Sequence, residues 1–79
     1  MKIGEIINLL SELVEDHTVP RNVKSKLESV INTLKEDADL SLRVNKALNI
    51  LDEVSDDNNI QPYTRTQLWN LVSMLESLS

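Results

Sequence analysis

Pairs of carboxylates recur at helical spacing in the two halves of the chain. Glu12 and Asp16 are four residues apart, and Glu53 and Asp57 repeat that spacing. Side chains at positions i and i+4 share one face of a helix, so each pair presents two carboxylates together. Four inward carboxylates would suggest a di-iron bundle, but such sites also use Glu-x-x-His pairs, which this sequence does not contain. We expect both pairs to lie on a solvated acidic face.

His17 is the single histidine. Its neighbours Glu15 and Asp16 adjoin it in sequence, so their side chains diverge at a helix end and do not converge on a metal ion. The segment DDNNIQPYTRTQ resembles the start of a calcium loop but does not fit one. With Asp57 as the first position, Pro62 takes the sixth, which requires glycine, and Leu68 takes the twelfth, which requires glutamate. With one glycine and one histidine, a phosphate loop or a Ser/His/Asp set is also excluded. We expect no enzyme, no metal site and no cofactor.

Three cations begin a predicted helix: Arg21, Lys24 and Lys26 lie in a stretch that contains no acid. The start of a helix attracts phosphate groups, so these residues are candidates for a phosphate or RNA contact. In the alternative interpretation the three side chains point in different directions, and Lys24 pairs with Glu28. Thirteen acidic and eight basic residues give a net charge of −5, which repels polyanions and argues against nucleic acid as a partner.

The composition favours helices over strands. The chain of 79 residues has one Gly, two Pro, one Trp, one Tyr and no Phe or Cys, so a disulfide cannot stabilise it. The first sixteen residues mix acids into an apolar run and have no small-residue cleavage site, which argues against a signal peptide. No apolar stretch is long enough to cross a bilayer. We expect an all-α, acidic, cytoplasmic protein without a membrane contact.

Apolar residues at helical spacing predict four helices, at about 2–16, 20–36, 40–56 and 62–77. Pro20 and Pro62 are each expected at the first helical position, where the missing N–H costs nothing. Asp39 is expected to cap the third helix through its carboxylate. Residues 1–79 are therefore expected to form one four-helix domain, with a first hairpin at about 2–36 and a second at about 40–77.

The two predicted hairpins resemble each other at an offset of 41 residues. IINLLSELVEDHTVPRNVKSKLESVINTLK then aligns with ALNILDEVSDDNNIQPYTRTQLWNLVSMLE. Core requirements explain the matched apolar residues but not Asn8 with Asn49 or Asp16 with Asp57, so we infer a duplicated hairpin. Two such hairpins sharing one core make a compact up-and-down four-helix bundle, or two stacked hairpins like those of HEAT arrays.

Trp69 is the first candidate for a partner contact. The offset equates it with Glu28, a position that faces water in the first half, and tryptophan is enriched at binding hot spots. Leu9 and Ile50 occupy equivalent positions on the flanks of the first and third helices and could extend an apolar patch. In the alternative interpretation Trp69 covers the edge of the core, and the apolar arcs are wide because the bundle has little else to bury.

Three stretches together resemble a known family: HTVPRN, ALNILDEVSDDNNI and RTQLWNLVSMLE. They resemble a small archaeal family of uncharacterised, conserved proteins of about ninety residues, whose members are similar around Pro20 and Arg21 and around Arg65, Trp69 and Asn70. The resemblance covers nearly the whole chain. It implies a compact up-and-down four-helix bundle of mirror or bromodomain-like topology, and it implies no activity or catalytic residue.

Together these features favour a non-enzymatic module that binds another protein, or itself as a homodimer, around Trp69, Leu9 and Ile50. The alternative is an RNA- or ribosome-associated accessory protein that uses Arg21 and its two neighbouring lysines. No small-molecule substrate is evident from the sequence.

Overall fold

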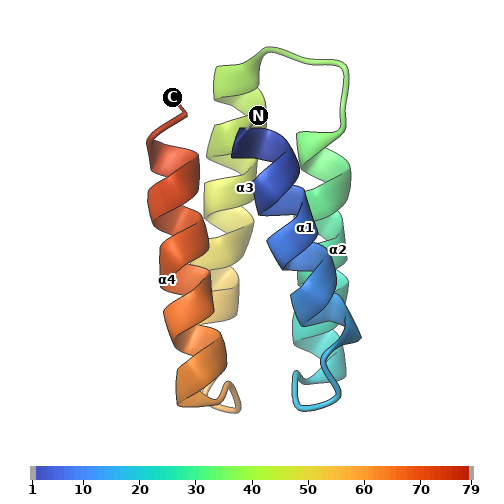
Figure 1. Ribbon diagram of the computed structural model, residues 1–79, viewed down its shortest axis with the longest axis vertical. Coiled ribbons are helices and arrows are strands. Elements are labelled where there is room, and N and C mark those ends of the chain that lie inside the picture. Colours follow the sequence, from blue (N-terminus) through green and yellow to red (C-terminus); the bar gives the residue numbers. More distant parts are fainter. Residues whose placement is uncertain (1, 79) are drawn as a thin grey trace.

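The computed structural model of the protein describes residues 2–78, which form four helices in an up-and-down bundle (Figure 1). They are α1 (Lys2–Glu15), α2 (Arg21–Leu34), α3 (Leu40–Ser55) and α4 (Pro62–Glu76). The predicted all-α class and the four-helix bundle are confirmed.

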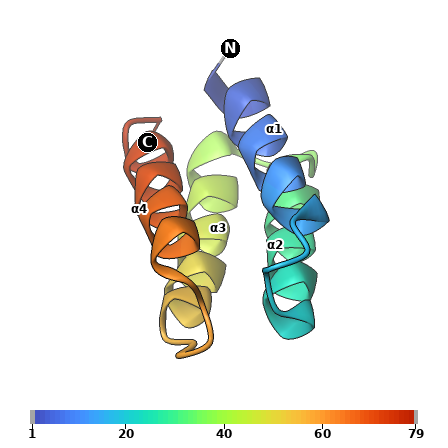
Figure 2. The ribbon, with the colours of Figure 1, turned by 60° about the horizontal axis from the view of Figure 1, so that its bottom comes forward.

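The helices form a square in which each helix packs against two others. α2 lies between α1 and α3, and α4 lies against both α3 and α1 (Figures 1 and 2). α1 runs parallel to α3, and the α1–α2 and α3–α4 turns lie at the same end of the bundle. α2 and α3 pack most closely and α1 and α4 least closely. The side between α1 and α4 is therefore the more open of the two sides that join the hairpins.

Buried side chains occupy corresponding positions in the two hairpins. At the offset of 41 residues, Leu10 and Leu51 are both fully buried, and so are Leu27 and Leu68. The remaining buried pairs are Ile6 with Ala47, Leu13 with Val54, Val19 with Ile60, Val23 with Thr64, Val30 with Leu71, and Leu34 with Leu75. Each hairpin thus contributes the same layers to one shared core, as the sequence offset predicts.

The two turns share one local hydrogen bond. The Thr18 amide donates to Oδ1 of Asp16 at 2.8 Å, and the Asn59 amide donates to Oδ1 of Asp57 at 2.8 Å. Short polar side chains that bond an amide two residues on are typical of turns. In each case the bond lowers the pKa of the carboxyl from its ordinary value. An ionised aspartate therefore stabilises each turn at the corresponding position.

Two predicted cap positions differ from the structure. Pro20 precedes α2 as its N-cap, with an extended ψ of 150°, so the prediction that it opens the helix is wrong, whereas Pro62 does begin α4. The starts of α2 and α4 are thereby in register at Arg21 and Pro62, although the prolines are not. Asp39 is the N-cap residue of α3, but its carboxylate makes no capping hydrogen bond.

Arginines from the following helix bind the last carbonyls of α2 and α3. Nη1 of Arg43 donates to the Leu34 carbonyl at 2.8 Å, and Nη1 of Arg65 donates to the Ser55 carbonyl at 2.8 Å. The final carbonyls of a helix have no partner within the helix, so these bonds satisfy groups that would otherwise need water. Both helices end one or two residues before the ends expected from the sequence, at Leu34 and Ser55.

Candidate partner-binding surface

The outward side of α4 is rich in aromatic surface. Tyr63 is 64% exposed and Trp69 is 59% exposed, the two highest values among the large hydrophobic side chains of residues 2–78. They flank a strip of exposed small or polar residues along the same helix. We call this surface the α4 outer face, and it consists of Pro62, Tyr63, Thr66, Trp69, Asn70 and Ser73.

The α4 outer face carries no charged side chain. The exposed surfaces of the other helices all do, for example Glu5 and Glu12 on α1, Glu28 on α2, and Asp52 on α3. The centres of protein interfaces are depleted in charge and enriched in Tyr and Trp. This composition distinguishes α4 as the side of the bundle best suited to cover a partner.

Arg65 does not add charge to this face, although it lies on the same helix. Its side chain is half-buried and turns towards the end of α3, where Nη1 binds the Ser55 carbonyl and Nη2 donates to the Asp57 carbonyl at 3.2 Å. The guanidinium is thereby committed to the fold. The side of α4 next to α3 is thus held in place while its outer face stays uncharged.

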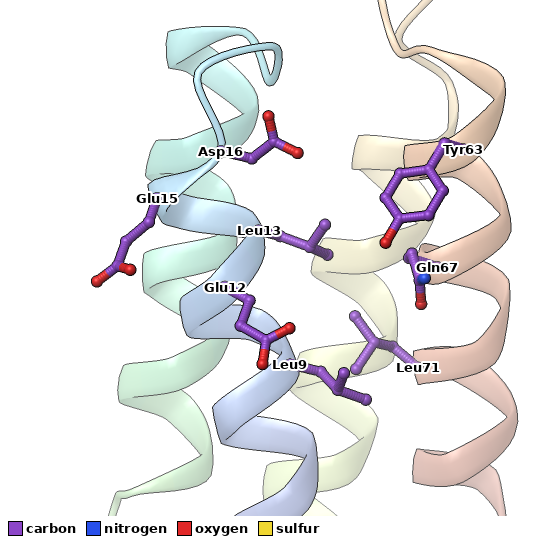
Figure 3. Close-up of a pocket in the computed structure, with 8 residues that line it drawn as sticks. All are labelled: Leu9, Glu12, Leu13, Glu15, Asp16, Tyr63, Gln67 and Leu71. Atoms are coloured by element: carbon purple, nitrogen blue, oxygen red, sulfur yellow. The ribbon is translucent and has the colours of Figure 1, made fainter.

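A groove of about 350 Å³ separates α4 from α1 on the other side (Figure 3). Its apolar floor is formed by Leu9, Leu13 and Leu71, and its rim includes Glu12 from α1 with Tyr63 and Gln67 from α4; Glu15 and Asp16 also line it. Figure 3 shows Leu13 pointing from α1 towards α4, whereas the carboxylate of Glu15 points away. Tyr63 belongs both to this groove and to the α4 outer face.

The opposite side, between α2 and α3, is closed by polar bonds. Nζ of Lys26 lies 3.2 Å from Oε1 of Glu53, and Nδ2 of Asn22 donates to Oδ2 of Asp57 at 2.8 Å. The bonds from Asn59 and Asn22 both lower the pKa of Asp57. Glu53 is exposed and Asp57 is half-buried, so both carboxylates lie at the surface as expected, and their bonds to α2 also join the two hairpins.

Comparison with known proteins identifies the family. The model of the uncharacterised protein family UPF0147 matches residues 1–78. The chain belongs to this family.

Two relatives of this UPF0147 chain illustrate the similarity. The chain is 40% identical over 79 residues to a UPF0147 protein of Sulfurisphaera tokodaii. The aligned region covers 98% of this chain and 88% of that protein. It is 44% identical over 69 residues to the UPF0147 protein MJ1419 of Methanocaldococcus jannaschii, covering 86% of this chain and 74% of that protein. The predicted resemblance to an archaeal family of uncharacterised proteins is confirmed.

Two crystal structures have the same fold as the UPF0147 chain. That of the protein MMP1188, of unknown function, matches with a TM-score of 0.94 at 40% identity and covers 99% of this chain and 90% of that one. The crystal structure of a UPF0147 protein from Thermoplasma acidophilum matches with a TM-score of 0.94 at 37% identity. The match covers 99% of this chain and 93% of that one. The bundle is thus shared by a solved member of this family and by MMP1188.

The three residues predicted to contact a partner do not lie together in the structure of the UPF0147 chain. Trp69 is too exposed to cover the core, so that alternative interpretation is wrong. Leu9 and Ile50 are half-buried and pack against the core from α1 and α3, which are diagonal to each other in the bundle. Only Leu9 lies beside α4, in the groove with Tyr63, so the three residues do not form one patch.

The three cations also differ in their surroundings. Arg21 is exposed, Lys24 is half-buried, and Lys26 is held by Glu53 across the α2–α3 side. Within residues 2–78, Lys24 forms no ion pair with Glu28, so the expected pairing along α2 is wrong. One of the three charges that RNA would need is thus already opposed by a carboxylate.

Sequence reasoning missed Tyr63 and Gln67. Both line the groove, and at the offset of 41 residues they correspond to Asn22 and Lys26, which close the other side of the bundle. Comparing these two pairs in the sequence would have shown that one side carries a lysine where the other carries an amide.

Among residues 2–78, no three His, Cys, Asp or Glu side chains come close enough together to hold a metal ion. Within the same range, no helix is both long and apolar enough to span a bilayer.

Proposed function

We propose that this protein is a non-enzymatic interaction module that binds another protein through the α4 outer face. The observation that carries the proposal is the pair of exposed aromatics, Tyr63 and Trp69, on the one helix whose exposed side is uncharged before its last residue, Glu76. A tryptophan can bury a large apolar area and one N–H donor in a partner at a small entropic cost.

The shape of the bundle supports the same function. α4 is anchored on one side by the bonds of Arg65 to the end of α3, and the core residues Leu68 and Leu71 fix its inner face. The outer face is therefore presented on a rigid element. A preformed surface of this kind loses little conformational entropy when a partner binds.

A second copy of this chain is a further candidate for the partner. An isologous contact between two α4 outer faces would place no like charges against each other, although each copy carries a net charge of −5 that slows the encounter. Light scattering of the purified protein separates this case from a foreign partner. A dimer that is lost with Trp69→Ser assigns the face to self-association.

The test is a quantitative capture from an extract of the native host with the wild type, Trp69→Ser and Leu42→Ser. Leu42 is the matched control because it is 55% exposed on another helix. We expect a stoichiometric protein partner that is retained by the wild type and Leu42→Ser and lost with Trp69→Ser. Helical circular dichroism of each variant shows whether the bundle remains folded.

Two results would overturn the proposal. In the first, all three baits recover the same proteins in the same amounts. In the second, recovery depends on RNA: ribosomal proteins that disappear after RNase treatment, but are unaffected by Trp69→Ser, would favour RNA association through Arg21 and Lys24. Binding of that kind also weakens steeply with added salt.

A further inference from the structure

We propose that the groove between α1 and α4 receives a lysine side chain from a basic segment of the partner protein. This inference rests on the proposed function, since the groove adjoins the α4 outer face at Tyr63 and a partner lying on that face can reach into it. It adds the chemistry of the group that the partner must supply.

The molecule contains its own example of the bound state. On the α2–α3 side, Lys26 extends from α2 to the carboxylate of Glu53, with Nζ 3.2 Å from Oε1, and Asn22 binds Asp57 one turn away. These four residues correspond, at the offset of 41, to four residues on the α1–α4 side. Gln67 corresponds to Lys26, Tyr63 to Asn22, Glu12 to Glu53 and Asp16 to Asp57.

The α1–α4 side keeps the carboxylate but not the cation. Among the side chains of residues 3–78, Glu12 has no ion-pair partner, because Gln67 is neutral where its counterpart is a lysine. The two helices also pack less closely there than α2 and α3 do. An open groove with an unopposed carboxylate therefore stands where the other side holds a lysine.

The lining of the groove suits a lysine along its whole length. Leu9, Leu13 and Leu71 form an apolar floor for the methylene stem, and Glu12 lies on the rim where the ammonium group would emerge (Figure 3). Lysine commonly buries its stem against apolar surface while its charge stays near solvent. The ring of Tyr63 offers a further favourable contact to a cation.

The size of the groove and the charge of the chain favour a side chain of a foreign, basic protein. A volume of about 350 Å³ lies near the lower limit for ligand pockets and is sufficient for one extended side chain. A second copy of this chain would bring a net charge of −5 towards Glu12 and Asp16. Opposite charge selects a basic segment instead.

The first experiment titrates the isotope-labelled protein with Nα-acetyl-lysine methylamide and follows its amide NMR signals. We expect shifts at Glu12, Tyr63 and the Gln67 side chain, and clearly smaller shifts at the same concentration of the norleucine analogue, which keeps the stem without the charge. Glu12→Gln should weaken binding by about five-fold, as expected for a partly exposed ion pair. Asp52→Asn, which neutralises an exposed carboxylate on α3 that lies outside the groove, is the matched control and should bind normally.

The second experiment fills the groove from within. In Gln67→Lys the new side chain should reach Glu12 as Lys26 reaches Glu53, abolish the shifts caused by the lysine probe, and prevent capture of the partner while Trp69 is intact. Ser25→Lys adds the same charge at an exposed position on α2 and should capture the partner normally.

The outcomes separate this inference from the proposed function. If Gln67→Lys keeps the partner while Trp69→Ser loses it, the lysine inference is wrong and the interaction module stands. If the lysine probe shifts the groove signals but no partner depends on Trp69, the module is wrong, and the groove then takes free amines such as cadaverine. Equal shifts with the lysine and norleucine probes would refute the role of Glu12.

Discussion

Truncation of Leu51 is expected to destabilise the bundle strongly. Leu51 is fully buried in α3, and Leu51→Ala removes three carbon atoms from the core. At about 0.8 kcal/mol for each buried methylene, the lost transfer free energy is about 2.4 kcal/mol, and the cavity left behind raises the total to about 2–5 kcal/mol. A domain of 79 residues has a free energy of unfolding of about 4–12 kcal/mol, so the loss is a large fraction of it.

The two hairpins make this prediction specific. Leu10 occupies the corresponding position in α1 and is also fully buried, so Leu10→Ala should cost a similar amount. Leu42 lies on the same helix as Leu51 but is 55% exposed, so Leu42→Ala should change stability by less than about 0.5 kcal/mol. The same Leu→Ala substitution should thus destabilise the protein strongly at one position of α3 and hardly at all at another.

Urea unfolding followed by helical circular dichroism measures these differences. The three variants and the wild type should share one slope, so that their midpoints report stability directly. A loss below about 1 kcal/mol at Leu10 or Leu51 would refute the shared core of two equivalent hairpins. A loss at Leu42 equal to that at Leu51 would refute the assignment of the two faces of α3.

Three further predictions concern polar contacts. Bonds from Asn59 and Asn22 lower the pKa of folded Asp57, so its stabilisation is complete above the ordinary carboxyl pKa and is lost as pH falls through the lowered value. Asn22→Ala should make unfolding midpoints less sensitive to acid; unchanged sensitivity would contradict this. Lys26→Gln should lower the free energy of unfolding by less than about 1 kcal/mol, because the ion pair with Glu53 is exposed. In urea unfolding at high salt, the difference from the wild type should vanish; a loss that does not depend on salt would contradict this assignment. Arg65→Lys should lower stability by about 1–3 kcal/mol in urea unfolding, since it loses bonds to two carbonyls, whereas no loss would show that these bonds are dispensable.

The helices and their core were accessible from the sequence because they depend on local spacing. Apolar residues at intervals of three and four place Leu10 and Leu51 inward whatever the neighbouring helix is. The offset of 41 residues likewise predicts that Asp16 and Asp57 build similar turns, and both accept the amide two residues on. The position of Pro20 was not accessible, because proline is accepted both just before a helix and at its first residue.

Contacts between helices were beyond sequence reasoning because they depend on which helices become neighbours. The sequence offered Lys24 a partner on its own helix, Glu28, whereas the ion pair that forms joins Lys26 to Glu53 on α3. The groove has the same origin: its residues come from α1 and α4, the two ends of the chain, and neither segment reveals it alone. The exposure of Trp69 depends equally on how α4 is rotated against the core, since a wheel places it only at the edge of the apolar arc.

Photo-crosslinking in living cells tests the central claim most directly. A photoreactive phenylalanine replaces Asn70, within the α4 outer face, or Asn45, exposed on α3. We predict one discrete protein adduct from position 70, absent from position 45 and lost when Trp69→Ser is added. Equal adducts from both positions, or an adduct from position 70 that persists in Trp69→Ser, would contradict the assignment of the α4 outer face as the partner-binding surface.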